Sequence, residues 1–112
     1  MDALVKLYKA IGDVSRLKLL RLLAEDEYCV CELVEVMGFS QSAVSQHLSR
    51  LKDAGLVQER RQGLWTYYRL ESDSLKEIQA VLAAFMNCPI AEIPEMETEA
   101  QRLSSLDRVN CC

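Results

Sequence analysis

Five cysteines are the residues of this sequence whose chemistry is most informative. Cys29 and Cys31 are two residues apart in the segment CVCEL, Cys88 stands alone, and Cys111 and Cys112 end the chain. An odd number of cysteines in a chain without a secretory signal argues against a disulfide framework. We therefore expect free thiols, metal ligands or redox sensing.

A second group of polar side chains follows Gly38 and is suited to the edges of DNA bases. Ser40 is an expected N-cap, and a helix to Gly55 would bury Val44, Leu48 and Leu51. Hydroxyls and amides on its other faces can contact bases or phosphates. The candidate DNA contacts on this helix are Ser40, Gln41, Ser42, Ser45, Gln46, His47 and Arg50. His47 suits a DNA contact and a packing role equally well.

The segments around this helix predict a helix-turn-helix with a β-hairpin behind it. A short apolar helix is expected from Cys29 to Met37, and the turn 38–40 joins it to the polar helix. Residues 56–61 and 64–70 are β-prone, and Gln62-Gly63 is the expected hairpin turn. We expect the hairpin aromatics to pack within the hairpin, although such rings could also stack on bases.

The charge distribution is uneven and favours DNA binding. The formal net charge of −4 excludes a uniformly basic surface, but residues 46–70 hold five basic and two acidic side chains. The basic residues of this window that could face phosphates include Arg50, Arg60 and Arg61. A polar helix alone is usually a solvated face; the helix pair and basic hairpin together make DNA the favoured partner.

Three further helices are expected around this unit. The first runs to Ile11. The second is capped by Asp13 with an inward stripe of Leu17, Leu20, Leu23 and Ala24, and the last is capped by Ser72 or Asp73 and ends before Asn87. The apolar stripes of the first and last helices could serve the core or a seam between two copies. They are Leu4, Leu7 and Ile11 in the first and Leu75, Ile78, Leu82 and Phe85 in the last.

The length of 112 residues fits one core and is too short for a cofactor domain joined to a substrate domain. We expect residues 1–88 to form one DNA-binding and dimerisation domain. Residues 89–112 would be a flexible acidic tail with one helix near Leu103. No apolar run approaches the ~20 residues of a membrane span, so we expect no membrane partner and a cytoplasmic protein.

Residues 5–86 resemble the ArsR/SmtB family of bacterial repressors. The resemblance is carried by GFSQSAVSQHLSRLKDAGLV, which matches the family's DNA-contacting unit, and by CVCEL, which matches the metal box of its arsenite-responsive branch. Two positions depart from the family pattern: Val14 replaces a usual proline, and Val34 is found where well-known arsenite repressors have a third cysteine.

The resemblance implies a mainly helical fold with a β-hairpin wing, a homodimeric winged helix-turn-helix. It also implies a palindromic DNA operator and release of that operator by metal. The first and last main helices would form the dimer interface. Two copies also match two half-sites one helical turn apart, which one copy with few basic residues would bind weakly.

The expected inducer is As(III) or Sb(III), which form three bonds to sulfur. Cys29 and Cys31 supply two sulfurs, and the third could come from Cys88, Cys111 or Cys112 of either protomer; we favour the terminal pair. Within a helix, residues two apart point about 200° away from each other, so Cys29 and Cys31 would meet only if the helix start were distorted or unwound. That distortion would move the DNA-contacting helix.

The sequence is compatible with other inducers, but it argues against an enzyme. Cadmium or lead also bind thiolates, and a cysteine pair can sense oxidants or persulfides. A zinc or cobalt site of the family's His and carboxylate type is not expected, because His47 is the only histidine. A thiol enzyme would need an arginine or glycine-rich loop to hold an oxyanion, and CVCEL has neither.

Overall fold

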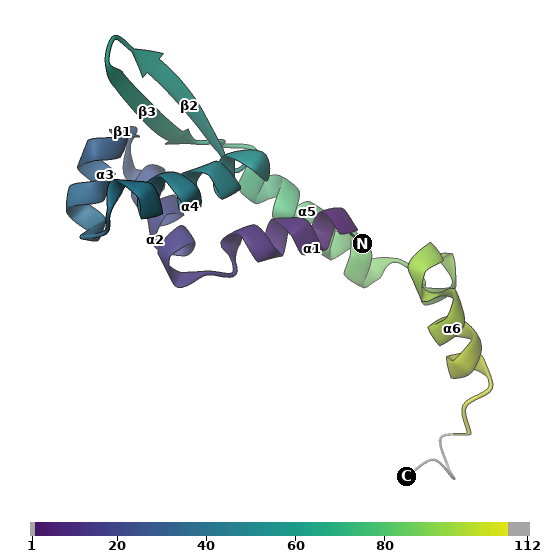
Figure 1. Ribbon diagram of the computed structural model, residues 1–112. Helices are drawn as coiled ribbons and strands as arrows, with labels where there is room; N and C mark the ends of the chain where they lie inside the picture. The colour runs from purple at the N-terminus through teal and green to yellow at the C-terminus, as the bar shows by residue number, and fades with distance from the viewer. Residues whose placement is uncertain (1, 108–112) are drawn as a thin grey trace.

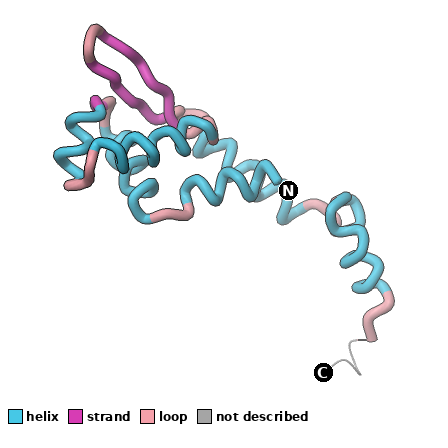
Figure 2. The backbone as a smooth tube through the Cα atoms, viewed as in Figure 1, coloured by secondary structure: helices cyan, strands magenta, loops and turns pink. Residues whose placement is uncertain are grey.

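The computed structural model describes residues 2–107 as a helical body with a projecting hairpin and a C-terminal extension (Figure 1). Figure 2 shows that strands are confined to the hairpin and a short piece beside it. The elements are α1 (Asp2–Ile11), α2 (Val14–Glu25), β1 (Tyr28–Cys29), α3 (Val30–Met37), α4 (Gln41–Asp53), β2 (Val57–Gln62), β3 (Trp65–Leu70), α5 (Ser74–Asn87), two 3₁₀ turns η1 (Ile90–Glu92) and η2 (Pro94–Met96), and α6 (Glu97–Ser104).

The expected helix-turn-helix is present as α3 and α4. Gly38 ends α3 with a φ of 72°, a left-handed conformation that side chains rarely adopt. The Ser40 hydroxyl then accepts the backbone N–H of Ala43 at 3.1 Å and starts α4. These local signals confirm both the turn and the beginning of the polar helix.

The hairpin is also present, with its turn one residue later than expected. Gln62 pairs with Trp65, so the two turn residues are Gly63 and Leu64. Gly63 has a φ of 60°. A type II′ turn has a glycine with positive φ at its first turn position and a residue with negative φ at its second, as Gly63 and Leu64 do.

A strand that was not expected joins the hairpin to the helix-turn-helix. Tyr28 and Cys29 form β1, which pairs antiparallel with β3 through Tyr68 and Tyr67. The sheet order is β1-β3-β2. Cys29 therefore belongs to the sheet and is not the first helical residue of α3.

The core lies where α2, α3, α4 and the base of the hairpin meet. Its largest fully buried side chains are Leu19, Leu33, Val44, Leu48, Leu51 and Leu56. The stripe predicted for α2 is partly wrong: Leu20 and Leu23 are buried, but Leu17 is 56% exposed and Ala24 is also exposed. Leu19 takes their place, because α2 packs against both α4 and β3 and not along one line of residues.

The first and last main helices lie against each other but leave much of their apolar surface uncovered. On α5, Ile78 is buried, whereas Leu75 and Leu82 are exposed. Asp73 is at the N-cap position of α5 without a capping hydrogen bond from its side chain; the Ser74 hydroxyl instead donates to the carbonyl oxygen of Gly55 at 2.7 Å. No helix within residues 2–107 is long and apolar enough to cross a membrane.

The C-terminal extension makes the molecule elongated. The principal extents are 65 × 25 × 20 Å and the radius of gyration is 19.4 Å, against about 13 Å for a compact chain of this length. The expected tail helix is present as α6, and it leads away from the body (Figure 1).

Truncation of the core should destabilise the fold strongly. Leu48 is 0% exposed and Leu64 is 100% exposed. We expect Leu48→Ala to lower the free energy of unfolding by about 2–5 kcal/mol, because it removes buried contacts and leaves a cavity. Leu64→Ala, the matched control, should change it by less than about 0.5 kcal/mol.

Urea denaturation at one fixed protein concentration measures both values, since any association of copies makes stability depend on concentration. Equal losses for the two variants would contradict this placement of the core.

Candidate functional site

Cys29 and Cys31 lie next to each other at the start of α3. Their sulfur atoms are 2.7 Å apart and both thiols are free. The helical separation of about 200° does not apply to them, because Cys29 is the N-cap residue, with the extended angles φ −79° and ψ 160°. The helix is unwound at Cys29, as the expected meeting of the two sulfurs required. The chain changes direction at Cys29, and the two sulfurs meet without any distortion of α3.

Glu32 fixes this start of the helix. Its carboxylate accepts the backbone N–H of Cys29 at 2.9 Å, as the third residue of a capping box does. That hydrogen bond lowers the pKa of the Glu32 carboxyl. The cap holds Cys29 in place while Cys31 occupies the first turn of α3.

The two thiols have different environments. Cys29 is 5% exposed, and burial raises its pKa to about 11, with its hydrogen bond to Cys31 acting in the same direction. Cys31 is exposed. At neutral pH Cys29 is thus a protonated thiol that is less accessible than Cys31.

The thiol pair opens into a groove of about 400 Å³ between α3, α4 and the hairpin, which we call the thiol groove. Gln41 and Ser45 line it from the first turns of α4. Arg61 and Trp65 line it from β2 and β3. The structure therefore brings the sensor candidates Cys29 and Cys31 together with three of the predicted DNA contacts.

The polar row of α4 faces outward as expected. The exposed residues are Ser40, Gln41, Ser42, Ser45, Gln46 and Arg50, whereas Val44, Leu48 and Leu51 of the same helix are buried. His47 is half-buried and accepts a hydrogen bond at Nδ1 from Arg16 Nη1 at 3.4 Å. Its position is therefore partly a packing one.

Arg16 is a residue that the sequence stripe did not single out. Its Nε donates to the carbonyl oxygen of Ala10 at 2.5 Å and its Nη2 to that of Lys9 at 3.1 Å. The guanidinium thus satisfies the last carbonyls of α1 and contacts His47 of α4 at the same time. In the sequence, only its position at the start of α2, after the cap residue Asp13, could have indicated this role.

The two predicted hairpin cations, Arg60 and Arg61, differ in the contacts that they already make within the chain. Arg60 forms an ion pair with Glu27, and its guanidinium lies 4.7 Å from the centre of the Tyr67 ring. The Arg60 contact lowers the pKa of Glu27. Arg61 lines the thiol groove and forms no ion pair within residues 2–107. Of the two predicted hairpin contacts, Arg61 is the more available.

Tyr68 and Glu59 fasten the hairpin to α4. The Tyr68 hydroxyl donates to Glu59 at 2.9 Å, and Lys52 Nζ lies 2.8 Å from the same carboxylate. Lys52 and Tyr68 lower the pKa of Glu59, and burial raises that of Tyr68 to about 12. This confirms packing as the role of Tyr68, whereas Trp65 is exposed.

A third sulfur for the pair is not found in the described part of the chain. No group of three or more His, Cys, Asp or Glu side chains within residues 2–107 could hold a metal ion. Cys88 ends α5 at the other end of the body from α3 (Figure 1). The favoured candidates Cys111 and Cys112 lie outside the described residues.

Comparison with known proteins gives the family. The model of "Bacterial regulatory protein, arsR family" matches residues 13–59. The chain is 42% identical over 74 residues to the uncharacterised HTH-type transcriptional regulator MJ1325 of Methanocaldococcus jannaschii, covering 65% of this chain and 83% of that protein.

Two relatives named for arsenic or cadmium resistance are similar over a smaller share of their own length. The arsenic resistance transcriptional regulator ArsR1 of Pseudomonas putida is 40% identical, over 67% of this chain and 59% of that protein. A cadmium resistance regulatory protein, the CadC homolog of Staphylococcus aureus, is 34% identical, over 65% of this chain and 61% of that protein. The chain thus matches less than two thirds of either relative.

Solved structures agree with the fold. A crystal structure of a possible transcriptional regulator for arsenical resistance has a TM-score of 0.66 at 29% identity, covering 91% of this chain and 98% of that one. The homodimeric winged helix-turn-helix DNA-binding domain Mb0332 of Mycobacterium bovis has a TM-score of 0.64 at 28% identity, covering 84% of both chains.

The helix pair α3–α4 followed by the β2–β3 hairpin is a winged helix-turn-helix, the class of domain that places one helix in the DNA major groove. Within this class, the chain belongs to the ArsR family of bacterial transcriptional regulators. The expectation that it is a regulator and not an enzyme is confirmed by this membership.

The two thiols should differ in reactivity. At pH 7.5 we expect iodoacetamide to modify Cys31 at least about tenfold faster than Cys29, since only the thiolate reacts and Cys29 is buried with a raised pKa. Raising the pH towards 11 should speed the modification of Cys29, because its thiolate fraction grows. Fragment-ion mass spectrometry of the peptide that contains both residues measures each rate.

The control is the same reaction in concentrated guanidinium, where the two rates should become similar. Equal rates in the folded protein would contradict the buried N-cap position of Cys29.

Proposed function

We propose that this chain represses transcription as a homodimer bound to double-stranded operator DNA, and that As(III) or Sb(III) releases it by binding Cys29 and Cys31. The observation that carries the proposal is the shared groove: the two adjacent thiols open into the space between α4 and the hairpin. The family and the arsenic-resistance relative support the same assignment. A cytoplasmic location follows from this role.

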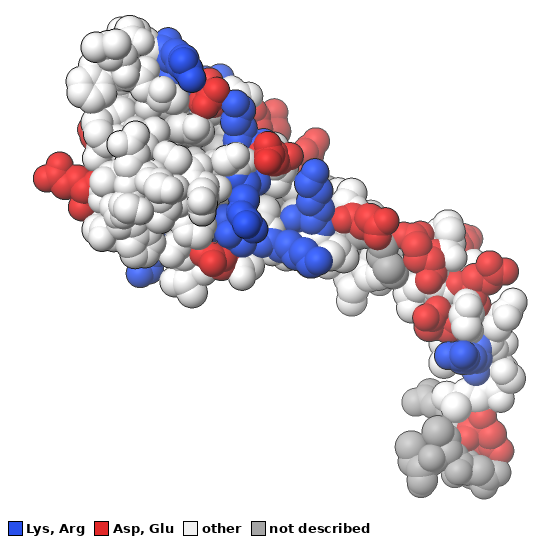
Figure 3. All heavy atoms as spheres, in the orientation of Figure 1, with Lys and Arg blue, Asp and Glu red and all other residues white. Residues whose placement is uncertain are grey.

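The DNA contacts would come from the exposed row of α4 and from the hairpin. Gln and Ser side chains at the start of α4 suit base edges in the major groove, because an amide can both donate and accept hydrogen bonds. Arg50 and Arg61 would neutralise phosphates. Lys and Arg atoms lie on the hairpin and the body next to it, whereas Asp and Glu predominate on the segment after α5 (Figure 3).

The pairing of two copies would use α1 and α5. A hollow of about 530 Å³ lies between these helices, lined mainly by apolar side chains such as Tyr8 and Leu82. Large exposed apolar residues on one face favour burial in an interface. Those on α1 and α5 include Val5, Tyr8, Val81, Leu82 and Met86. The homodimeric description of one structural neighbour supports the pairing of two copies.

The binding step is a condensation of thiols with arsenous acid. Each thiol gives its proton to one arsenic-bound hydroxyl, water leaves, and a sulfur–arsenic bond forms, so three thiols release three waters and arsenic stays trivalent. Cys31 reacts first because it is exposed, and Cys29 completes the pair across a separation of 2.7 Å. The third thiol is Cys111 or Cys112 of either protomer.

Release of DNA follows from the position of the pair. The chain that delivers the third sulfur has to enter the thiol groove beside Gln41, Ser45 and Arg61. Cys29 is also paired with Tyr67 of β3, so a shift of its backbone moves the hairpin. A ligand that binds only the DNA-free arrangement lowers the affinity for the operator by linkage.

The sulfur separation also favours one alternative, a thiol-redox repressor on the same fold. One thiolate attacks a peroxide to give a sulfenic acid and hydroxide, and the second thiol displaces water to form a disulfide. Cadmium or lead, as the cadmium-resistance relative suggests, would be bound by the same thiols. The release experiment below separates these inducers.

Replacement of Arg61 should weaken DNA binding in a salt-dependent way. The DNA is a duplex selected from a randomised pool. Arg61→Ala should make the negative slope of log affinity against log salt shallower by about 2 per dimer, because each copy loses about one phosphate contact. Arg102→Ala, which removes an equally exposed arginine from α6, should leave the slope unchanged. Fluorescence anisotropy at four salt concentrations measures both slopes.

If Arg61→Ala has the wild-type slope, the hairpin does not contact phosphates through this residue and the docking geometry is wrong.

Arsenite should release that duplex only when the thiol pair is intact. We expect Cys29→Ser and Cys31→Ser to raise the arsenite concentration for half-release at least about tenfold, because each removes one of three sulfur bonds. Cys88→Ser, the matched control, should release like the wild type. Anisotropy during titration with arsenite, cadmium and peroxide in parallel gives the midpoints.

A Cys31→Ser variant that still responds at the wild-type midpoint would overturn the sensor assignment. Release by peroxide or cadmium but not by arsenite would overturn the inducer while retaining the fold and the DNA site.

A further inference from the structure

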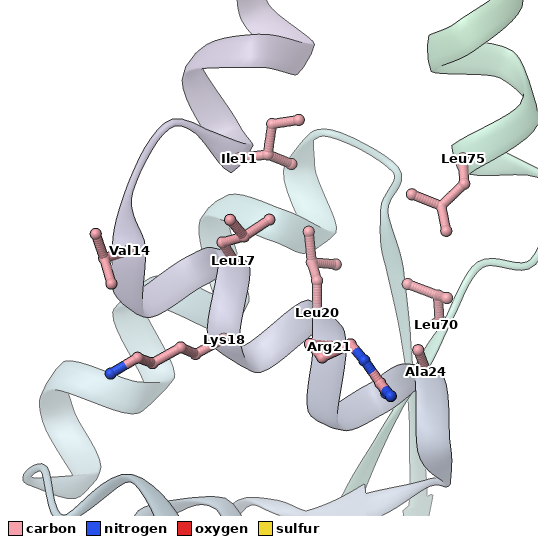
Figure 4. A pocket seen from close by; sticks show the side chains of 9 residues that line it. All are labelled: Ile11, Val14, Leu17, Lys18, Leu20, Arg21, Ala24, Leu70 and Leu75. Carbon is pink, nitrogen blue, oxygen red and sulfur yellow. The ribbon is translucent and has the colours of Figure 1, made fainter.

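An apolar groove of about 620 Å³ lies on α2, away from the DNA-contacting helix, and we call it the α2 groove. Figure 4 shows its apolar side chains converging from four elements, with Lys18 and Arg21 on the α2 side. The apolar residues that line its centre are Ile11 of α1, Leu17 and Leu20 of α2, Leu70 of β3 and Leu75 of α5.

The apolar side chains of the α2 groove are left partly uncovered in a single chain. Leu17 is 56% exposed and Leu75 is 45% exposed, and Val14 at the end of the groove is exposed as well. These are the positions at which the stripes of α2 and α5 failed to reach the core. Continuous exposed apolar surface of this kind marks a binding site, because its burial is favourable.

The chain also contains a segment with a complementary surface. Residues 89–107, which we call the C-terminal arm, include η1, η2 and α6 and extend away from the body (Figure 1). Met96, directly before α6, and Ala100 and Leu103 within it follow one another at helical spacing and form one apolar stripe. Leu103 remains 52% exposed.

Length and charge match between the arm and the groove. The eight residues of α6 span about 12 Å, and the part of α2 from Val14 to Ala24 that lines the groove spans about 15 Å. Glu97 and Glu99 flank the apolar stripe of the arm. Lys18 beside the groove has no ion-pair partner in the described part of the chain, and Arg21 is paired only within its own helix, with Glu25.

We propose that the C-terminal arm of one copy docks in the α2 groove of a second copy, with the apolar stripe of the arm on Leu17 and Leu75 and Glu97 or Glu99 facing Lys18. The inference rests on the pairing of copies proposed above. It extends that pairing to a second, separate contact.

The second copy fits the arm better than the same chain does. The arm starts at Pro89, after α5, whereas the groove includes Leu75 in the first turn of α5, about 20 Å away along the helix. A two-fold axis that pairs α5 with its copy in antiparallel fashion brings the end of one α5 near the start of the other. The exchange is then reciprocal, so two arms fill two grooves.

Limited proteolysis at Arg102 tests the docking in the full-length protein. Arg102 is an exposed residue of α6, and an arginine-specific protease cuts after it when the arm is free. We expect the cut to slow at least about fivefold as the protein concentration rises through the range in which two copies form, because docking hides the site. Mass spectrometry follows the cut, and sedimentation gives the mass of the assembly.

Surface variants then identify the groove. Leu17→Glu and Lys18→Glu should each restore fast cutting while the two-chain mass remains, and Glu97→Lys combined with Lys18→Glu should recover at least half of the protection. Val36→Glu, at another exposed apolar residue, which lies in α3, is the control and should stay protected.

A two-chain mass with fast cutting of the wild-type arm would overturn the docking alone. Protection that does not depend on concentration would overturn it in favour of the arm's own chain, and unchanged protection in Leu17→Glu would overturn the groove as the site. A single-chain mass at every concentration would overturn the paired repressor, and the docking with it.

Discussion

The pairing of β1 with β3 is the contact on which the arrangement of this molecule depends. Two residues, Tyr28 and Cys29, add a third strand to what would otherwise be an isolated hairpin. A two-stranded hairpin is marginally stable in water, so this short strand, together with the Tyr68–Glu59–Lys52 contacts, holds the wing at a defined angle to α4. The same strand ends at the N-cap of α3, so the backbone of the thiol pair and that of the wing are hydrogen-bonded neighbours.

Under the proposed function, this arrangement brings the sensor thiols and the DNA contacts close together. The thiol groove has walls from α3, α4 and the hairpin, and its side chains include both sulfurs and three polar or basic residues assigned to DNA. In this fold a ligand need not act across the molecule to disturb DNA binding. Arg16 provides a second connection, because it joins the end of α1 to His47 of α4. A helix proposed to pair two copies is thereby linked directly to the helix proposed to contact DNA.

Local signals in the sequence predicted most of the fold. Asp13, Ser40 and Gly38 act through backbone chemistry within three residues, and each performs its expected role in the structure. Gly63 has the positive φ of a hairpin turn, although that turn is one residue later than expected. What could not be predicted depends on contacts between distant segments. The apolar run CVCELV fits a helix from its first residue, and only the approach of β3 makes Cys29 a strand residue. Leu17 and Leu19 are equally apolar, and packing on two sides of α2 decides which one is buried. The candidate DNA residues followed from residue type, whereas the engagement of Arg60 by Glu27 required the folded loop.

The N-cap position of Cys29 has a consequence for protein design. A pair of ligands two residues apart is discarded by any helical-wheel search, since the wheel places them on opposite sides. When the first of the two is the last extended residue before a helix, they form a compact bidentate site that needs no loop of its own and no break in the helix. Such a site could be grafted at the start of an existing helix, with a glutamate three residues after the first cysteine to hold the cap. A ligand bound there would have a fixed position relative to the axis of that helix.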